Sequence, residues 1–326
     1  MSAYLPASAA FVWAMAAVLV ATLAAGLGIS RLPRRGATRA AAWAVVVTSV
    51  ALVERLSADQ PAGLRMLALI GTLLYAMKAV VTVDGMEAGR PALSPLRWLG
   101  FAALWPGMRP EPFATAGGPP LPGARALVKR GLVRLALGGV LVAVARLAWV
   151  ATRSRFLATA FALPGLSFIL HFGIFNVVAG AWRHAGVDVD TLFRAPLRSK
   201  SLAEFWGRRW NLAFSEMTAI GVYRPLSRVT GKPTALAVAF LFSGLLHELA
   251  ISLPVKAGFG LPLLYFAIHG ALMLTERGLE RAGRPVYARP GLGRAWTTFW
   301  LVAPLPILFH RPFLRGVVWP ILGIPG

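Results

Sequence analysis

The sequence predicts an all-α integral membrane protein with about eight transmembrane helices (between about seven and ten), because apolar content, block length and charge placement agree. Apolar residues make up 57% of the 326 residues and charged residues only 14%, outside the range of ordinary soluble domains. The apolar residues form blocks of roughly 17–25 residues, the length that a helix needs to cross about 30 Å of hydrocarbon. The alternating ten-residue segments of a membrane β-barrel are missing, so the spans must be helical.

The apolar blocks make the whole chain, residues 1–326, a single polytopic membrane domain. The first block, Ser8–Gly28, is too long for the apolar region of a signal peptide and follows no basic residue, so we predict a retained span. Two further segments, 92–105 and 313–324, are predicted to enter the membrane to half its depth. The predicted spans are 8–28, 40–56, 64–83, 127–150, 156–181, 234–254, 259–275 and 295–310.

The basic residues are unevenly distributed over the loops. Threading the spans back and forth places the loops 31–39, 84–130, 183–232 and 277–294 on one face, with about 24 of the 34 Lys and Arg residues. By the positive-inside rule this face is cytoplasmic and the N-terminus lies outside. The formal charge of +22 therefore indicates orientation and contact with anionic membrane lipids, not nucleic acid. The Ala, Arg, Gly and Pro content is typical of a GC-rich bacterial genome, which favours a bacterial plasma membrane.

Two loops have a distinctive composition. Residues 106–123 hold six prolines, which remove too many backbone donors for a regular helix, so this segment is a Pro/Gly-rich loop. The loop 183–232 contains SLAEFWGRRWNLAFSEM, which mixes aromatic, basic and helix-forming residues. We predict an interfacial amphipathic helix here, with Ser201 as its N-cap and Glu204 completing a capping box.

The chain has no cysteine, which excludes disulfides, thiolate metal sites, iron–sulfur clusters and an enzyme-bound thioester. Serine-hydrolase elbows, zinc-protease motifs and dinucleotide or phosphate loops are also missing. No metal is expected.

His247 is the strongest chemical candidate because it lies deep in the apolar block FLFSGLLHELAISL, where an ionisable side chain is costly unless it has a function or a partner. Helical spacing places Ser243 and Gly244 one turn before it, a small and polar face with room for a substrate. Glu248 follows directly and could pair with an arginine of the preceding segment. His171 and His269 also lie within apolar blocks, whereas His184 and His310 are expected at the interface.

A second candidate is Phe205-Trp206-Gly207-Arg208-Arg209-Trp210-Asn211. In a helix, Trp206 and Trp210 would be neighbours, as would Gly207 and Asn211, which forms an aromatic stripe beside a polar amide. Trp and Arg residues also anchor interfacial helices without any further function, so the residues alone leave both interpretations open.

Together, FWGRRWN at 205–211 and SGLLHE at 243–248 resemble the membrane-bound O-acyltransferase superfamily, and most closely its wax synthase-like branch. In that family a Phe-Trp-x-x-x-Trp-Asn segment precedes a span with Ser-Gly-x-x-His-Glu. The interval of some 36 residues between Asn211 and His247 is the expected one. The resemblance covers roughly residues 100–275, whereas residues 1–83 carry no matching motif.

The resemblance implies a helical bundle with a buried tunnel, in which acyl-CoA and a lipophilic hydroxyl acceptor meet. His247 would be the general base, and Asn211 would hold the thioester and donate to its developing oxyanion. No cofactor is implied; acyl-CoA is a co-substrate. The residues implied to bind substrate, at the CoA entrance or around the histidine, are Trp206, Arg208, Arg209, Trp210, Ser243, Glu248 and His269.

Three alternatives stay open. The acceptor could be a glycolipid, a sterol-like alcohol, a carotenoid glycoside or an exported polysaccharide, although the sparse external loops favour a membrane-soluble acceptor. A proton-coupled transporter could use His247 and Glu248 as a relay, but no inverted repeat or broken helix pair is evident. A membrane scaffold would leave the buried His-Glu pair unexplained.

Overall fold

The computed structural model describes residues 2–33 and 36–325, and within them the chain is helical without a β-strand, which confirms the all-α prediction. The chain divides into two compact units. Unit 1 comprises Met1–Thr191 with Leu314–Gly326, and unit 2 comprises Leu192–Phe313. The boundary between them falls inside the predicted loop 183–232.

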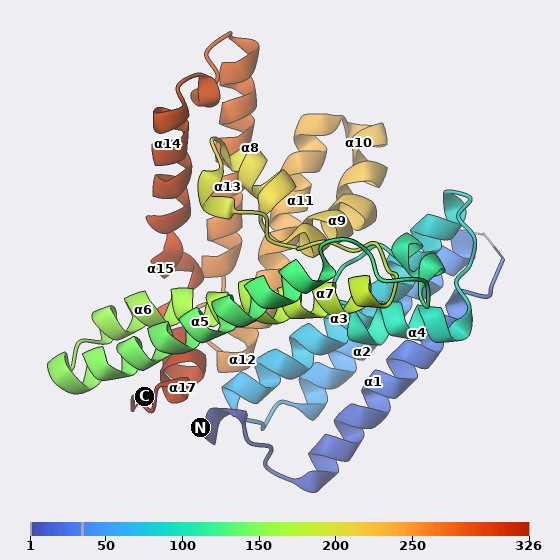
Figure 1. Cartoon of the computed structure of the whole chain (residues 1–326), viewed down its shortest axis with the longest axis horizontal. Coiled ribbons are helices and arrows are strands. Elements are labelled where there is room, and N and C mark those ends of the chain that lie inside the picture. Colours follow the sequence, from blue (N-terminus) through green and yellow to red (C-terminus); the bar gives the residue numbers. More distant parts are fainter. Residues whose placement is uncertain (1, 34–35, 326) are drawn as a thin grey trace. The chain divides into compact units, whose positions relative to one another are not determined.

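Unit 1 holds the first three long helices and a long helical hairpin (Figure 1). Its helices are α1 (Ala9–Ile29), α2 (Gly36–Leu56), α3 (Ala62–Glu87), α4 (Pro95–Leu104), α5 (Ala124–Thr152), α6 (Arg155–Ser167), a π-helical segment (Phe168–Ile174), α7 (Phe175–His184), a second π-helical segment (Leu314–Val318) and α17 (Trp319–Ile321), with short 3-10 turns at Ser2–Tyr4 and Glu111–Thr115.

Unit 2 holds the two motif segments. Its helices are α8 (Leu202–Glu204), α9 (Leu212–Thr218), α10 (Arg224–Thr230), α11 (Lys232–His247), α12 (Leu253–Val255), α13 (Leu261–Arg281), α14 (Pro290–Val302), α15 (Leu305–Leu308) and α16 (Arg311–Phe313). Between them lie π-helical segments at Phe205–Arg209, Ala219–Tyr223 and Glu248–Ser252, and 3-10 turns at Pro196–Arg198 and Val286–Ala288.

Among the described residues, six helices are long and apolar enough to cross a membrane, or seven if the bent pair 291–308 and 311–321 counts as one span. They are Ala9–Ile29, Gly36–Leu56, Ala62–Glu87, Ala124–Thr152, Arg155–His184 and Lys232–Val255. The predicted span 259–275 coincides with α13, which does not meet the same requirements. The membrane class is confirmed, whereas the count of eight spans is not.

A buried lysine fastens the start of the Pro/Gly-rich loop. Lys78 of α3 is fully buried, and its ammonium donates to the carbonyls of Trp105 at 2.7 Å and Gly107 at 2.5 Å. The same ammonium lies 4.1 Å from the centre of the Phe101 ring. Carbonyl acceptors and an aromatic face replace water around this charge, so Lys78 fixes where the loop leaves α4.

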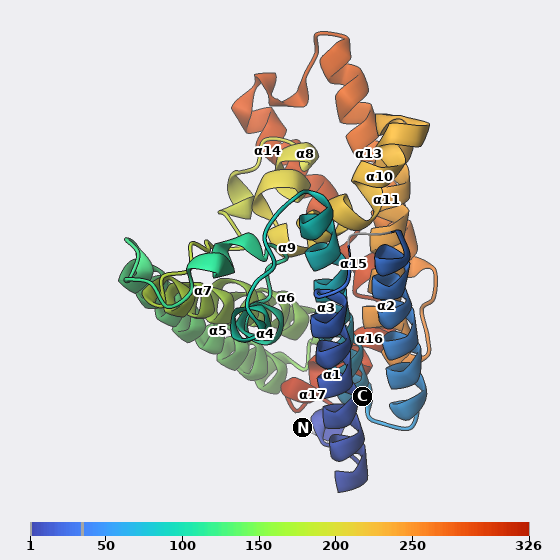
Figure 2. The ribbon, with the colours of Figure 1, turned by 90° about the vertical axis from the view of Figure 1, so that its right-hand side faces the viewer.

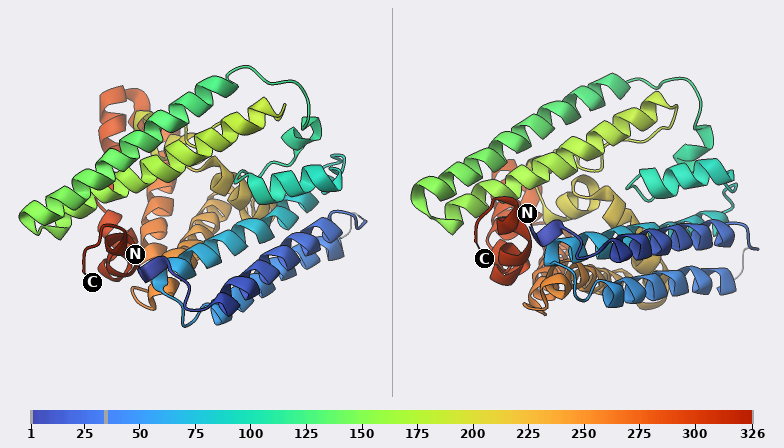
Figure 3. Two further views of the ribbon diagram at one scale, coloured as in Figure 1. Left: turned by 60° about the horizontal axis from the view of Figure 1, so that its bottom comes forward. Right: turned by 90° about the horizontal axis from the view of Figure 1, so that it is seen from below.

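Glycines draw the two arms of the hairpin together. Figure 3 shows α5 lying along the arm that runs from α6 to α7. A Cβ atom added at Gly138 would lie 2.8 Å from the Gly165 carbonyl oxygen, and one at Gly131 would lie 2.9 Å from that of Gly173. Small residues let membrane helices approach this closely. Because lipid is itself apolar, van der Waals packing and not the hydrophobic effect holds such helices together.

We expect Gly138→Ala to destabilise unit 1 and its neighbour variant Gly139→Ala not to do so. Overpacking a close contact costs about 1–3 kcal/mol, whereas a Cβ at Gly139 meets nothing within 4 Å and alanine gains helix propensity of about 1 kcal/mol. Thermal unfolding in detergent should give a lower Tm for the first variant only. Equal Tm values for both variants would contradict the close contact.

In unit 2, α11 and α13 cross closely (Figure 2). A Cβ atom at Gly244 of α11 would lie 2.9 Å from the Cα of Leu263, and one at Gly270 of α13 would lie 3.0 Å from the Cβ of Phe240. The expectation that Gly244 leaves room for a substrate is therefore wrong, because α13 fills that space. The glycine instead brings α13 against the helix that carries His247.

Candidate active site

The motif segment begins at the predicted cap. The Ser201 hydroxyl oxygen accepts the N–H of Glu204 at 3.0 Å, which confirms Ser201 as the N-cap. The Glu204 carboxylate reaches back to the N–H of Lys200 at 2.8 Å, one residue before the cap. The capping box is therefore closed, but the Glu204 carboxylate accepts from the N–H of Lys200 and not from that of the cap residue Ser201, which is the usual donor.

The prediction of one continuous helix through this segment is wrong. After the π-helical turn Phe205–Arg209, Trp210 is extended and Asn211 has a φ of 42°. Asparagine tolerates this left-handed conformation better than most residues. Its side-chain oxygen accepts the N–H of Phe214 at 3.2 Å and so caps α9. Gly207 and Asn211 therefore do not share a helical face, and the cap does not use the Asn211 amide nitrogen.

Both tryptophans of the motif pack within unit 2. Trp210 stacks on Phe205 with ring centres 5.4 Å apart and meets Phe193 edge-on at 4.9 Å. The Trp206 indole N–H donates to Nδ1 of His269 at 3.2 Å. These contacts fix the turn that precedes Asn211, while the role of either tryptophan in substrate binding stays a prediction.

The two arginines of the motif differ in their surroundings. Arg209 Nε donates to the Glu204 carboxylate at 2.7 Å, and its Nη1 donates to the carbonyl of Arg194 at 3.1 Å. Arg208 is exposed. Of the two guanidinium groups predicted at a CoA entrance, that of Arg208 is therefore accessible to solvent, whereas that of Arg209 ties the turn to the preceding loop.

The Arg209 ion pair predicts a pH-dependent stability. Burial alone would raise the pKa of Glu204. Hydrogen bonds from the Lys200 backbone N–H and the Arg209 side chain, together with the positive charges of the Arg209 and Lys200 side chains, instead lower this pKa below the ordinary 4.5. A carboxylate whose pKa is lower in the folded than in the unfolded state stabilises the folded protein at pH values above the unfolded-state pKa. This stabilisation is lost as the pH falls through the folded-state pKa. At neutral pH Arg209→Gln should therefore lower stability by up to about 1 kcal/mol, and the difference from wild type should shrink below pH about 4.5.

Arg208→Gln is the matched control for this measurement, because it also removes one positive charge, from the position just before Arg209. It should leave the pH dependence of Tm unchanged. If Arg208→Gln shifted the low-pH Tm profile as Arg209→Gln does, the effect would come from net charge and not from the ion pair.

His247 occupies the last position of α11, just before the π-helical segment Glu248–Ser252, and π-helical turns often mark functional sites. Its Nδ1 lies 2.7 Å from the carbonyl oxygen of Ser243. A carbonyl can only accept, so Nδ1 carries the proton, and Nε2 of the neutral ring keeps a lone pair. Local helix geometry thus fixes the tautomer of His247, and its role as a base stays a prediction.

Aromatic rings hold the His247 imidazole and link it to the first motif. The ring centre lies 4.1 Å from that of Phe266 on α13 and 5.4 Å from that of Phe214 on α9. The N–H of Phe214 is the donor that Asn211 accepts. The two predicted catalytic residues, about 36 positions apart in sequence, are therefore joined through one phenylalanine.

Ser243 contributes through its backbone. Its hydroxyl donates to the carbonyl of Ala239 at 2.9 Å within the same helix, while its carbonyl oxygen orients His247. A hydroxyl that bonds back to the i−4 carbonyl is a common arrangement in apolar helices. A substrate contact by this hydroxyl stays a prediction.

Glu248 does not pair with an arginine of the preceding segment as expected. One carboxylate oxygen accepts the N–H groups of Gly260 at 2.9 Å and Leu263 at 3.0 Å. These are the free donors at the start of α13, where the positive end of the helix dipole favours a carboxylate. Glu248 thus joins the end of the His247 helix to the beginning of α13.

His269 has the opposite tautomer to His247. Because Nδ1 accepts from Trp206, Nε2 of the neutral ring carries the proton. The side chain is fully buried, and Nε2 has no hydrogen-bond partner within the described part of the chain. An unsatisfied buried donor costs about 1–3 kcal/mol, so this N–H is a group that an incoming acceptor oxygen could satisfy.

His310 was expected at the interface but is buried. Its Nδ1 accepts the N–H of Phe313 at 3.3 Å, which leaves Nε2–H to face the Ser252 hydroxyl at 3.3 Å. Of the three histidines of unit 2, only His247 therefore has its Nε2 lone pair available as a base. Among the residues described, no three His, Asp or Glu side chains gather as a metal site would need.

Glu276 supports the motif segment, and the sequence reasoning missed it. It is buried, and its carboxylate accepts the N–H groups of Leu202 at 2.8 Å and Ala203 at 3.0 Å and the indole N–H of Trp296 at 3.0 Å. It lies seven residues after His269, on the same face of α13. An acidic residue at that spacing from a buried histidine was the available signal.

Residues 189–267 match the sequence model of the membrane bound O-acyl transferase family. The predicted resemblance to this family is confirmed. Nearly all of the matched segment lies in unit 2, and it contains Asn211 and His247, whereas His269 and Glu276 lie just beyond its end.

Curated relatives point to the wax synthase-like branch of the family. The chain is 30% identical over 143 residues to the probable long-chain-alcohol O-fatty-acyltransferase 9 of Arabidopsis thaliana, covering 40% of this chain and 42% of the relative. It is 32% identical over 106 residues to the long-chain-alcohol O-fatty-acyltransferase of Simmondsia chinensis, covering 30% of each chain. The matched region thus spans less than half the length of these relatives.

Proposed function

We propose that this protein transfers a fatty acyl group from acyl-CoA to the hydroxyl of a lipophilic alcohol. The tautomer of His247 carries the proposal, because it leaves a lone pair on Nε2 beside the Asn211-capped turn. The family segment and the long-chain-alcohol O-fatty-acyltransferases similar to it support the same reaction.

In the proposed reaction His247 Nε2 accepts the hydroxyl proton while the hydroxyl oxygen attacks the thioester carbonyl carbon. The new C–O bond forms, the C–S bond breaks, and the CoA sulfur leaves with the proton that His247 took up. The Nδ1–H bond to Ser243 keeps the ring oriented and supports the transient positive charge, as a fixed acceptor does for the histidine of other acyl-transfer sites.

The carbonyl oxygen that becomes negative needs donors. The Asn211 amide nitrogen is proposed for this role, because its cap uses only the amide oxygen. His269 Nε2–H is a second candidate, since it is protonated and unsatisfied. Arg208 is proposed to meet a CoA phosphate, because it is exposed on the motif turn.

The donor is proposed to arrive from the cytoplasm, where the basic loops are predicted, and the acceptor from the hydrocarbon phase of a bacterial plasma membrane. The proposed lipophilic acceptor agrees with the apolar rings around His247, of which Phe266 and Phe214 are the nearest described.

Purified protein in detergent should be incubated with labelled palmitoyl-CoA and hexadecanol, a glycolipid or no acceptor, while free CoA and lipid products are followed. We expect CoA release that depends on hexadecanol, with a labelled wax ester as product. Release only with the glycolipid would change the proposed acceptor. If the protein neither bound acyl-CoA nor released CoA with any acceptor, the transferase proposal would be contradicted.

A further inference from the structure

The hairpin of unit 1 is strongly basic, and one of its arginines, Arg183, pairs with Asp188 just beyond α7 at 2.6 Å. From residue 112 to residue 187 the sequence contains seven arginines and one lysine but no aspartate or glutamate. Three basic residues line one pocket: Arg125 and Lys129 on the first two turns of α5, and His184 at the end of α7. Like charges at one place repel unless an anion joins them.

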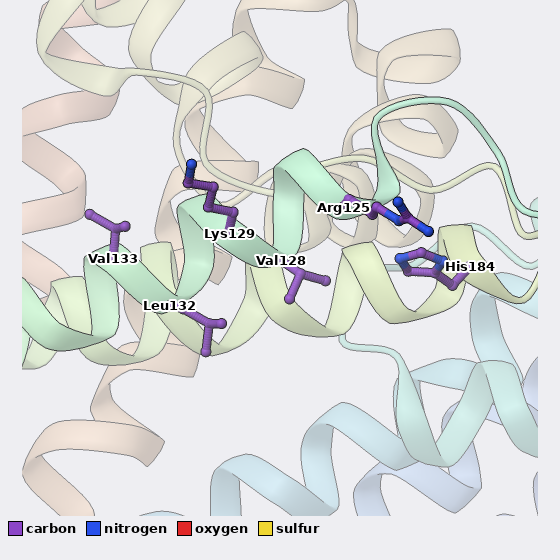
Figure 4. Close-up of a pocket in the computed structure, with 6 residues that line it drawn as sticks. All are labelled: Arg125, Val128, Lys129, Leu132, Val133 and His184. Carbon is purple, nitrogen blue, oxygen red and sulfur yellow. The ribbon is translucent and has the colours of Figure 1, made fainter.

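A pocket lies at this place. Its volume is about 300 Å³, at the lower end of the roughly 300–1,000 Å³ typical of ligand pockets, and its lining consists of Arg125, Val128, Lys129, Leu132, Val133 and His184. Figure 4 shows the side chains of Arg125 and His184 pointing toward one another from α5 and α7. The surface of the pocket is almost wholly apolar, and the Lys129 side chain points away from Arg125 and His184 (Figure 4).

Close helix packing builds this arrangement. A Cβ atom at Gly180 would lie 2.9 Å from the Ala124 carbonyl oxygen and 2.6 Å from the Val128 side chain. Gly180 thus holds the last turn of α7 against the first turn of α5. His184 follows one turn later, on the same face of α7 as Gly180, which brings it to Arg125.

The apolar lining of the pocket continues into an exposed apolar face of α5. Leu132 and Val133 are 55% and 60% exposed, and Leu137 and Val140 further along the helix are 44% and 58% exposed. Such a face on a membrane helix contacts acyl chains. The basic residues therefore lie where a lipid on this face would place its headgroup.

We infer that this pocket binds an anionic phospholipid, with an acyl chain along the apolar lining at Val128 and Leu132 and the phosphate between Arg125 and His184, while Lys129 adds a positive charge beside them. Charge complementarity selects the anionic headgroup, and the continuous apolar face selects a lipid over a free phosphate ion. The inference concerns unit 1 alone and does not depend on the proposed transferase activity.

The test compares lipid retention in three proteins: wild type, Arg125→Gln/Lys129→Gln, and Arg281→Gln/Arg284→Gln. The last is a matched control that removes two exposed charges from another predicted basic loop. Each is equilibrated in detergent with equal amounts of phosphatidylglycerol and phosphatidylcholine, and bound lipid is counted by native mass spectrometry. Tm of each variant is recorded to confirm folding.

We expect wild type and control to retain phosphatidylglycerol preferentially, and the pocket variant to lose that preference by roughly five-fold per charge removed, about 25-fold in all. Arg125→Lys/Lys129→Arg, which keeps both charges, should restore most of it. An equal loss in pocket variant and control would overturn the inference in favour of diffuse charge attraction. Displacement of the lipid by millimolar inorganic phosphate would overturn it in favour of a plain phosphate site.

If the pocket variant misfolds, Leu132→Asn decides the question. It leaves every charge in place and interrupts only the aliphatic lining, so it should weaken retention of phosphatidylglycerol relative to wild type. Unchanged retention in that variant would show that no acyl chain lies along α5.

Discussion

His247→Asn is expected to lower turnover by about 10²–10⁴-fold while the protein still folds and binds acyl-CoA. The asparagine amide can reproduce the Nδ1–H bond to the Ser243 carbonyl, which is 2.7 Å long in the wild type, but it has no counterpart of the Nε2 lone pair. The variant therefore deletes the proposed base and little else.

The measurement is the rate of hexadecanol-dependent CoA release, with acyl-CoA binding and Tm as controls. Glu280→Gln is a suitable comparison, because Glu280 is exposed and, among the described residues, its carboxylate is hydrogen-bonded only by the Tyr287 hydroxyl. More than about a tenth of wild-type turnover in His247→Asn would remove His247 from the base role. If His247→Asn both abolished acyl-CoA binding and lowered the Tm, the role of His247 would be structural instead.

Glu276→Leu is expected to have the largest effect on stability, about 3–5 kcal/mol, with a parallel loss of activity. Three donors lose their acceptor: the N–H groups of Leu202 and Ala203 and the indole N–H of Trp296. A buried donor without a partner costs about 1–3 kcal/mol. Glu276→Gln keeps one carbonyl oxygen and should lose about half as much.

The activity readout tests whether Glu276 positions the motif. Leu202 and Ala203 begin the turn that leads to Trp206 and Asn211, and a displacement of about 1 Å at a catalytic group can lower turnover 10²-fold. In Glu276→Gln, kcat should fall at least ten-fold at a temperature where the variant stays folded, with KM for acyl-CoA changed much less. A Tm loss with unchanged kcat would make Glu276 a stability residue only.

Together these two variants separate the parts of the site. His247 acts on the reacting atoms in the proposed mechanism, whereas Glu276 acts through the backbone of residues 202 and 203. Both lie on helices that Gly244 brings into contact. The helix crossing therefore places the base and the support of the motif turn on adjoining helices.

The helical boundaries followed closely from sequence because hydropathy is a local property. The predicted span 8–28 became Ala9–Ile29, and 64–83 became Ala62–Glu87. Ser201 was recognised as a cap because capping depends on residues only three positions apart. The conformation of Asn211 could not be predicted in the same way, because nothing in the neighbouring residues indicates that the backbone adopts a positive φ there.

The partners of charged groups could not be inferred in the same way. Glu248 was expected to meet an arginine, but it meets backbone amides twelve and fifteen residues later. Glu276 holds amides more than seventy positions away. A carboxylate accepts from either kind of donor, so only the packing of α13 against the neighbouring segments determines which it finds.

The sequence by itself determined the membrane class, the helical architecture, the two motifs and the choice of His247, because apolar block length and a buried ionisable residue carry these conclusions without distant contacts. The tertiary structure decided which nitrogen of His247 keeps its lone pair, which arginine is exposed, what fills the space beside Gly244 and what supports the motif turn. Each of these depends on directional hydrogen bonds and close packing between segments far apart in sequence, which hydropathy and spacing do not encode.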